Sequence, residues 1–448
     1  MTPKVKKRIE QIRQGIVPEG YKKTESGIIP NEWRVGQVSK CIEEYKFFSN
    51  DISHIPVYSS SRKGLVPQSD YYNQREAVET NLGYKVVPQG YVTYRHMSDD
   101  DVFHFNINKT GENVLVSSEY PVFTSSDNCD LSFLISVLNN TARFRYFCKM
   151  QKLGGTRTRL YLDNLKRYAL ALPPFDEQKK IAEILSTQDK AIELQGRKIE
   201  ELKRFKKGCL EKMFPRKGQK VPETRFPGFT GDWEQRKLGE VFEEYSEKNH
   251  SELPVLTILQ GSGTIHRDES DRKLLYDKSN LSNYKMVHEG DFIVHLRSFE
   301  GGLEIATNTG IISPAYHTFH GENTDSRFYY SYFRSKRFID IDLKPHIYGI
   351  RDGRSIDIEG MKTIKIPFPD YEEQKAISTY IRNLDNLITL HQRKLEEMKK
   401  QKKALMQLLL TGIVRVQGNR FCCDFRDDEE RNARNAVKGG ESYGNESP

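Results

Sequence analysis

The stretch of sequence that determines the fold is EQKKIAEILSTQDKAIELQGRKIEELKRFKKGCLEKMF, at residues 177–214. The chain carries a second version of it 196 residues later, at residues 373–410, as EQKAISTYIRNLDNLITLHQRKLEEMKKQKKALMQLLL, with 14 identities in 38 positions. The first copy has no proline, and apolar residues in both copies alternate at four- and three-residue spacings, which is typical of a heptad helix. At 1.5 Å per residue, about 37 residues extend roughly 55 Å, so the pattern indicates two long helices that act as spacers.

The apolar seam of each predicted helix is interrupted at matching polar positions. Gln195 and Lys206 in the first copy correspond to His391 and Lys402 in the second. Because neither helix can bury its stripe alone, we expect the two to pack on each other as an antiparallel coiled coil. The alternative is that each helix lies on its own domain. The remaining seam residues are Ile181, Leu185, Gln188, Ile192, Ile199, Leu202, Cys209 and Met213, and Ile377, Ile381, Leu384, Ile388, Leu395, Met398, Leu405 and Leu409.

The duplication extends beyond the two helical segments. The only two tryptophans, Trp33 and Trp233, lie 200 residues apart, and each is followed by Glu-Glu-Tyr, at residues 43–45 and 243–245. Matching residues at a nearly constant spacing predict that the chain consists of two fused half-molecules. Further matches at an offset of 194 join Gly155, Arg157, Asp163, Pro173 and Asp176 to Gly349, Arg351, Asp357, Pro367 and Asp370.

The predicted plan is an internal repeat of a variable unit followed by a long helix. The variable units alternate short β-rich runs with helical stretches at residues 131–149 and 326–341, so each is expected to be a mixed α+β globule. The polar C-terminal residues have no repeat partner and are expected to be disordered. The predicted boundaries are 1–24 for a basic N-terminal segment, 25–172 and 227–366 for the variable units, 173–215 and 367–416 for the helical segments, 216–226 for a linker and 417–448 for the tail.

Composition and motif searches exclude several classes of protein. The chain has 448 residues with a formal net charge of +8, and no run near 18 apolar residues that could span a membrane, so we expect a cytoplasmic protein. Its six cysteines show no CxxC spacing, which argues against a zinc ribbon. No P-loop and no metal-ligand cluster is evident, and Leu172 precedes Pro173-Pro174 where amino-methylating enzymes need Asn or Asp. We therefore expect no catalysis by this chain alone.

The order and duplication of these segments resemble the specificity (S) subunit of type I restriction-modification systems, up to about residue 415. The resemblance implies that each variable unit is a target recognition domain that reads one half of a split, asymmetric DNA sequence, held apart by the helices. It also implies partners: two modification subunits that use S-adenosylmethionine to methylate adenine, and restriction subunits that use ATP and Mg²⁺. This chain would itself hold no cofactor. The segments that carry the resemblance are residues 20–24, 28–30 and 33, residues 172–174 with 177–182, residues 366–367 with 373–374, and residues 296–302 with 312–316.

Two alternatives to a DNA-binding scaffold remain open at this stage. A coiled-coil adaptor that binds only protein partners would share the long helices, and it differs in having no DNA sequence preference. A self-contained nuclease or methyltransferase would show activity as the purified chain. The missing catalytic motifs argue against the second alternative.

Two loops at corresponding positions are the first candidates for DNA contact, because Arg and Lys reach guanine edges and basic groups also contact phosphate. They are residues 154–159 and 348–354, whose sequences are GGTRTR and YGIRDGR. Residues that read different bases should differ between the copies, so we expect Arg159 and Arg354 to contact bases, and the shared Arg157 and Arg351 to clamp phosphates. The alternative is that the shared arginines form structural ion pairs with Asp163 and Asp357. The candidates in these loops are Thr156, Arg157, Arg159, Tyr348, Arg351 and Arg354.

Four further polar segments supply a second group of candidates. These are residues 59–64, 94–96 and 260–264, together with His295 and Arg297. The Glu-Gln pairs that open both helical segments have a different expected role, which is capping of the helix start, with a contact to a partner subunit as the alternative. The second group of candidate DNA contacts is Arg62, Lys63, Arg95, Thr264 and Arg297.

Overall fold

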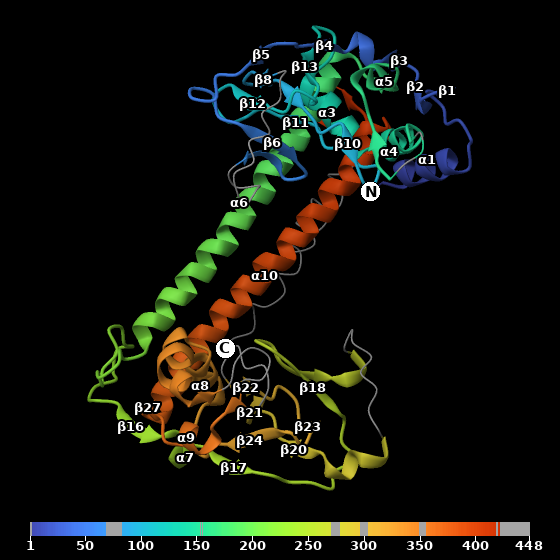
Figure 1. Ribbon diagram of the computed structural model, residues 1–448. Helices are drawn as coiled ribbons and strands as arrows, with labels where there is room; N and C mark the ends of the chain where they lie inside the picture. The colour runs from blue at the N-terminus through green and yellow to red at the C-terminus, as the bar shows by residue number, and fades with distance from the viewer. Residues whose placement is uncertain are drawn as a thin grey trace, which may run out of the picture. The chain divides into compact units, whose positions relative to one another are not determined.

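The computed structural model describes residues 2–68, 83–152, 154, 156–269, 278–295, 303–348, 355–417 and 420–421. The chain divides into two compact units, residues 1–193 with 396–448 and residues 194–395, which we call the first and the second unit. Each unit therefore contains one variable region and a part of both long helices (Figure 1). Among the described residues no helix is both long and apolar enough to span a membrane.

The two long helices predicted from the heptads are present. Helix α6 spans Phe175–Met213 and helix α10 spans Tyr371–Leu410. Each begins directly after a proline-containing extended segment. Each also carries two acidic residues in its first turn, where negative charge interacts favourably with the positive end of the helix dipole. Helix α6 ends just before Pro215, which cannot continue a helix.

Side-chain contacts join parts of α6 and α10 inside each unit. In the second unit Gln195 Nε2 donates to His391 O at 2.8 Å, so the polar seam residues of the two copies meet each other. Further along α6, Lys206 Nζ lies 2.6 Å from Asp385 Oδ1. The α10 partner moves backward as the α6 residue moves forward, so the two helices run in opposite directions in this unit. In the first unit Lys402 forms an ion pair with Asp189.

The first unit contains mixed α and β structure around one large core. Its main sheet has the order β11-β9-β13-β4, and a second sheet has the order β12-β8-β5. Two helices in sequence, α3 (Leu131–Asn140) and α4 (Ala142–Lys149), replace the single helix expected at 131–149, because Thr141 has an extended backbone between them. The strands are β1 (Tyr21–Thr24), β2 (Gly27–Pro30), β3 (Arg34–Gln37), β4 (Ile42–Glu44), β5 (Phe48–Ser49), β6 (Tyr58–Ser61), β7 (Gly64–Pro67), β8 (Tyr84–Val87), β9 (Val92–Thr93), β10 (Met97–Ser98), β11 (Asn106–Ile107), β12 (Val114–Val116), β13 (Val122–Ser125), β14 (Thr158–Arg159) and β15 (Ala169–Leu172), and the short helix α5 spans Leu162–Lys166.

The second unit has a corresponding set of elements. Its main sheet has the order β17-β24-β21-β22. Helix α8 (Ser326–Phe333) is shorter than the stretch expected at 326–341, since the chain continues as a π-helical segment, Phe338–Leu343. The other elements are β16 (Glu234–Lys237), α7 (Leu238–Val241), β17 (Glu243–Tyr245), β18 (Leu256–Leu259), β19 (Gly263–His266), β20 (Lys285–Val287), β21 (Phe292–His295), β22 (Glu304–Ile305), β23 (Gly310–Ile312), β24 (Tyr316–His320), β25 (Ile347–Tyr348), β26 (Ser355–Ile356), α9 (Ile358–Lys362) and β27 (Lys365–Phe368).

Equivalent interactions recur in the two units and establish an α+β fold with two repeated domains. The strand before each long helix pairs with the strand after each tryptophan, as β15 with β3 and β27 with β16. Asp130 caps α3 by accepting from Phe133 N at 2.8 Å, and Asp325 caps α8 by accepting from Phe328 N at 2.8 Å. The expected internal duplication is therefore present in the fold as well as in the sequence.

The ends of the chain differ from the expected boundaries. Residues 1–24 belong to the first unit, because α1 (Pro3–Arg13) places Val5 in the core and Tyr21 Oη donates to Gly412 O at 2.8 Å. At the C-terminal end, β28 (Val416–Gln417) pairs with β29 (Arg420–Phe421), so the start of the predicted disordered tail is a short hairpin. The rest of the predicted tail, residues 422–448, lies outside the described residues.

Candidate nucleic-acid interface

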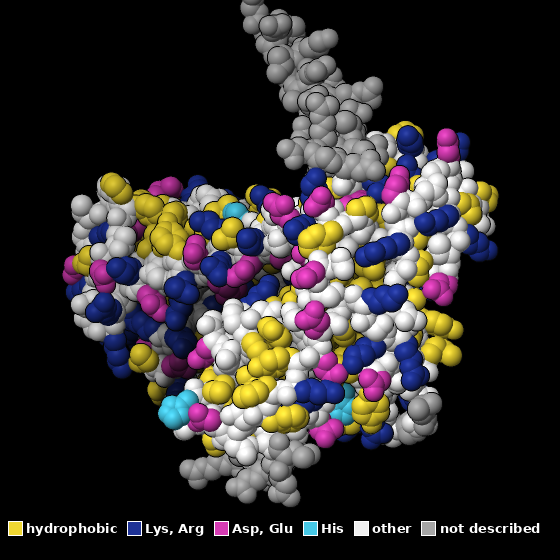
Figure 2. Space-filling view, turned by 90° about the horizontal axis from the view of Figure 1, so that it is seen from above, with side chains coloured by type: hydrophobic (Ala, Val, Ile, Leu, Met, Phe, Trp, Pro, Cys, Tyr) yellow, Lys and Arg dark blue, Asp and Glu magenta, His cyan; other side chains and the backbone are white. Residues whose placement is uncertain are grey.

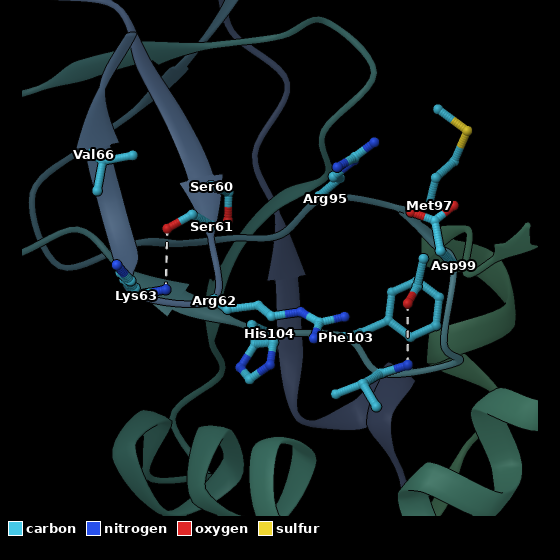
Figure 3. Close-up of a pocket in the computed structure, with 12 residues that line it drawn as sticks. Ser60, Ser61, Arg62, Lys63, Val66, Arg95, Met97, Asp99, Phe103 and His104 are labelled. Atoms are coloured by element: carbon cyan, nitrogen blue, oxygen red, sulfur yellow. Dashed lines mark hydrogen bonds between the residues drawn. The ribbon is translucent and has the colours of Figure 1, made fainter. Parts of the chain in front are cut away.

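A cleft of about 480 Å³ in the first unit brings together candidates from separate segments. Arg62 and Lys63 come from the turn between β6 and β7, and Arg95 precedes β10. The close-up shows the Arg62 side chain extended across the cleft beside His104 and Phe103, with Arg95 above it (Figure 3). All three cations are exposed, so the cleft presents positive charge to the solvent.

The β6–β7 turn is built to present its two basic residues. Ser61 Oγ donates to Gly64 O at 2.9 Å and accepts from Lys63 N at 3.1 Å, which closes the turn locally. Gly64 has a φ of +116°, a conformation that L side chains rarely adopt. Asn106 Nδ2 then ties the hairpin to β11 by donating to Ser61 O at 2.9 Å. The position of Arg62 and Lys63 thus depends on a rigid hairpin and not on a free loop.

Strand pairing brings the 154–159 loop next to residues that line the same cleft. Strand β14 pairs with β10, so that Arg159 lies opposite Met97 and Thr158 opposite Ser98. Arg157 Nε donates to Asp99 Oδ1 at 2.8 Å, and Asp99 lines the cleft. Arg159 and Thr156 are exposed. Five predicted cations, Arg62, Lys63, Arg95, Arg157 and Arg159, therefore lie on adjoining segments, although they span almost 100 residues of sequence.

Two aspartates orient the cations of the cleft. Arg62 Nη2 lies 2.6 Å from Asp100 Oδ2. Partial burial opposes ionisation of Asp100, but hydrogen bonds from Ser98 and Arg62 outweigh it and hold the pKa of this carboxyl below its usual value. Burial, together with the charge of Arg62, lowers the pKa of His104, so His104 is neutral at pH 7. At neutral pH the positive charge of the cleft therefore comes from Arg and Lys.

The ion pairs proposed as an alternative for the shared arginines have different partners in the structure. Arg157 pairs with Asp99 and not with Asp163, which lies 3.7 Å from Lys166 Nζ instead. Asp357 caps α9, where its Oδ1 accepts from Gly360 N at 3.0 Å. Arg351 and Arg354 lie outside the described residues, as does Arg297. In the neighbouring described segment, Tyr348 is 60% exposed at the end of β25.

Thr264 is a structural residue, which corrects its prediction as a DNA contact. Its side chain is 2% exposed, and its Oγ1 accepts from Thr307 N at 3.0 Å. The loop before it is anchored as well, because Gly261 N donates to the buried carboxylate of Glu304 at 2.7 Å. The glycine-containing segment 260–264, whose sequence suggested a polar loop that contacts DNA, instead allows β19 to pack closely against β22.

Exposure of a cation does not by itself mark a site on this protein. Lys and Arg side chains are spread over the face shown in Figure 2, with Asp and Glu among them. The cleft is distinguished by convergence of cations from three segments and by the aspartates that hold two of them. Sequence reasoning missed Asp99, Asp100 and His104, although the run Asp99-Asp100-Asp101 next to Arg95 was a visible signal. Among the described residues no group of three or more His, Cys, Asp or Glu side chains could hold a metal ion.

The Glu-Gln pairs at the start of α6 and α10 are buried and join separate parts of each unit. Glu177 accepts from Trp33 Nε1 at 3.1 Å and from Arg415 Nε at 2.8 Å. In the second unit Glu373 accepts from Trp233 Nε1 at 3.0 Å and from Arg225 Nε at 2.7 Å.

The glutamine of each pair has an equally specific role. Gln178 accepts from Asp130 N at 2.9 Å and donates to Pro173 O at 3.0 Å, and Gln374 makes the equivalent bonds to Asp325 N and Pro369 O, both at 2.9 Å. The four side chains are at most 5% exposed. The expected helix capping is therefore wrong: these residues are internal connectors, and their burial leaves no surface for a partner subunit.

Comparison with known protein families identifies the class of this chain. Residues 35–204 and 230–400 both match the family model described as the type I restriction modification DNA specificity domain. The chain belongs to this family. The two matched segments each contain one variable region and most of the long helix that follows it, as the internal duplication predicted.

Individual members of the DNA specificity family are similar over most of the chain. A provisionally named type I restriction enzyme MjaX specificity subunit of Methanocaldococcus jannaschii is 26% identical over 435 residues, which is 89% of this chain and 97% of that protein. The type I restriction enzyme MjaVIII specificity subunit of the same organism is 32% identical over 279 residues, 58% of this chain and 64% of that protein. A chain from a solved structure on complex assembly and conformational transition of the type I R-M system is 14% identical, with a TM-score of 0.50 over 86% of this chain and 99% of that one, and it shares the fold.

Proposed function

We propose that this chain is the DNA-specificity subunit of a type I restriction-modification complex. Each recognition domain binds one half of a bipartite, asymmetric DNA sequence. The observation that carries the proposal is the cleft of the first unit, which is lined by Arg62 and Arg95 from separate segments and has Arg159 on the adjoining strand β14, in a domain that the chain contains twice. Arg pairs with guanine edges and with phosphates, so such a cleft suits a duplex.

The long helices are proposed to act as an antiparallel coiled-coil spacer with pseudo-two-fold symmetry. The Gln195–His391 and Lys206–Asp385 contacts in the second unit and the Lys402–Asp189 pair in the first support this arrangement. A helix of 39 or 40 residues extends about 60 Å at 1.5 Å per residue, and a turn of B-DNA is about 34 Å. Two recognition domains on such a spacer could contact major-groove segments on successive turns.

Catalysis is assigned to partner proteins. We propose that the chain is non-catalytic, that it acts in the cytoplasm, and that it assembles with two modification subunits and with restriction subunits. S-adenosylmethionine, ATP and Mg²⁺ would then be bound by those partners. Apolar side chains exposed on the helices of the second unit, including Leu194, Phe205 and Leu390 at 54–63%, support protein docking there.

Footprinting with the modification partner on a random-sequence DNA library tests the proposal. We expect two short protected blocks separated by a gap without base preference. Exchanging residues 25–172 for the corresponding segment of another family member should change one protected block and leave the other. Protection without sequence preference would refute DNA specificity and favour the adaptor function, and a change in both blocks would refute the modular assignment.

A further inference from the structure

A groove of about 570 Å³ lies in the second unit. Its walls are the last turns of α6, the residues that follow α6, and the segment between α8 and the π-helical residues. Apolar side chains line part of it: Leu210, Phe214, Pro215 and Ile341. Ile341 is 44% exposed, whereas Phe214 is 5% exposed and belongs to the core of this unit.

The corresponding position in the first unit is covered by α1. The offset of 196 between the helical copies aligns Leu210 with Met406, and it aligns residues 216–217, which line the groove, with residues 412–413. In the first unit Gly412 O accepts from Tyr21 Oη at 2.8 Å, and Ile413 O accepts from Arg8 of α1. Helix α1 also contributes Val5 and Ile9, one helical turn apart, to the core that includes Met406 and Leu408–Leu410.

Burial at the two helix ends differs at one position, since Leu409 and Leu410 are buried and so are their counterparts Met213 and Phe214. Leu408 is 6% exposed in the first unit, whereas its counterpart in the second unit is Lys212, an exposed residue. The segment that follows α6 in the second unit, residues 216–226, is fully described and contains no helix. The groove of the second unit is therefore equivalent to the surface that α1 covers in the first unit, and the described residues that follow α6 supply no helix to cover it.

The charge of the groove defines what kind of helix would fit. Its lining includes eight Lys and Arg side chains and one carboxylate, that of Glu211. Several of these cations pair with carboxylates outside the groove, as Lys206 does with Asp385 at 2.6 Å and Arg216 with Glu223 at 2.9 Å. Lys217 and Lys336 form no ion pair with any described residue. The list of lining cations is Lys203, Lys206, Lys207, Arg216, Lys217, Arg334, Lys336 and Arg337.

Arg337 adds an unmet hydrogen-bonding demand at the same place. Its Nε and Nη1 are buried and make no hydrogen bond within the part of the chain that the structure describes. The carboxylate of Asp342 lies 3.6 Å from Nε, and burial raises the pKa of Asp342. Because both nitrogens are buried, Arg337 adds positive charge beneath the groove and not donors that an incoming side chain can reach.

We propose that this groove binds an acidic amphipathic helix of a partner protein, at the position equivalent to the one that α1 occupies in the first unit. Apolar side chains one turn apart on that helix lie on Leu210 and Ile341, and its Glu or Asp side chains pair with Lys217 and Lys336. A basic helix such as α1 itself is excluded by charge repulsion. The apolar floor distinguishes this surface from a phosphate-binding one, so the inference goes beyond the proposed DNA recognition and does not depend on it.

The probe is a charge-reversed version of α1. Residues 3–13 are PKVKKRIEQIR, and the fluorescein-labelled peptide PEVEEEIEQIE keeps the apolar spacing while replacing all five basic residues with Glu. Fluorescence anisotropy with the full-length chain should show saturable binding of this peptide that weakens with added salt. The native basic peptide and a scrambled acidic peptide of the same composition should bind at least about tenfold more weakly.

Charge reversal in the groove supplies the matched test. Lys217→Glu combined with Lys336→Glu should weaken binding of the acidic peptide by about tenfold or more. Lys400→Glu with Lys403→Glu, two exposed residues of α10 in the first unit, makes the same change in net charge and should leave binding within about twofold. Thermal unfolding of both variants checks that they are folded.

Three outcomes would overturn the inference. They are no saturable binding of the acidic peptide, equal binding by the two charge-reversed variants, and displacement of the peptide by a single-stranded oligonucleotide of equal charge at equal concentration. Duplex footprinting on the same preparations separates this inference from DNA recognition. Peptide failure with intact footprints refutes only the groove, and the reverse result refutes only the proposed function.

Discussion

Replacing Glu373 by Ala should strongly destabilise the second unit. The Glu373 side chain is fully buried, and its two oxygens accept from Trp233 Nε1 at 3.0 Å and from Nε and Nη2 of Arg225, both at 2.7 Å. These bonds join the start of α10 to the segment that follows α6 and to the segment that carries Trp233. Truncation removes the acceptor and leaves both donors in place.

The magnitude follows from what the donors lose. Removing one partner of a buried ion pair costs about 3–5 kcal/mol. Arg225 is 15% exposed and still donates to Gly231 O at 2.6 Å, so we take the lower limit, about 3 kcal/mol. The indole N–H of Trp233, which is 1% exposed, loses its acceptor at a cost of about 1 kcal/mol or more. The expected loss in free energy of unfolding is therefore about 4 kcal/mol.

The chain offers a direct assay because it contains only two tryptophans, one in each unit. In a Trp33→Phe background, Trp233 fluorescence reports unfolding of the second unit in urea. With a slope of about 2.5 kcal/mol per M, the midpoint should fall by roughly 1.5 M. Glu372→Ala, at the exposed neighbouring position, should shift the midpoint by less than about 0.2 M. A loss below about 1 kcal/mol for Glu373→Ala would refute the assigned role of the buried carboxylate.

Three further predictions concern candidate DNA contacts in both units and the pH dependence of the first unit. If Arg95 and Arg351 contact phosphates, Arg95→Ala and Arg351→Ala should each weaken binding to all DNA sequences. The slope of log affinity against log salt concentration should then become shallower by about one. Loss of preference at one base pair with an unchanged slope would instead indicate a base contact. Burial lowers the pKa of His96, so the unfolded chain binds a proton near pH 6.5 that the folded chain resists. The first unit should therefore lose stability as pH falls from 7 toward 5. In urea titrations His96→Phe should flatten this dependence of the free energy of unfolding on pH, and an unchanged dependence would contradict the assigned role of His96. Thr264→Val should destabilise the second unit by about 1–2 kcal/mol while leaving DNA affinity unchanged, since it orphans the amide of Thr307; a change in affinity without loss of stability would restore Thr264 as a contact.

The internal repeat made much of the architecture predictable. Heptad spacing depends only on residues a few positions apart, so α6 and α10 could be located to within a few residues at each end. Of the matching polar positions in the two seams, Gln195 and His391 contact each other, whereas Lys206 and Lys402 pair with Asp385 and Asp189. Local signals were weaker inside the recognition domains, where Thr141 interrupts a helix that looked continuous.

The roles of single polar residues could not be predicted in the same way. Thr264 and Arg157 both sat in glycine-containing loops with the composition of a DNA contact, yet one is buried against Thr307 and the other pairs with Asp99. Glu177 looked like a helix-capping residue because it opens the helical segment predicted from the sequence. Its actual partner, Arg415, is 238 residues away.

The sequence by itself determined the duplicated plan, the two long helices and the family, because periodicity and internal similarity are properties of the chain that need no knowledge of distant contacts. Only the tertiary structure decided which cations share a cleft, since that depends on the β10–β14 register and on the β6–β7 hairpin, which set the neighbours of Arg62 and Arg159. It also decided that α1 covers the end of one helix and that the matching groove in the second unit has no helix of the described chain over it. Packing of this kind is settled by which surfaces meet, and no local pattern of residues specifies that.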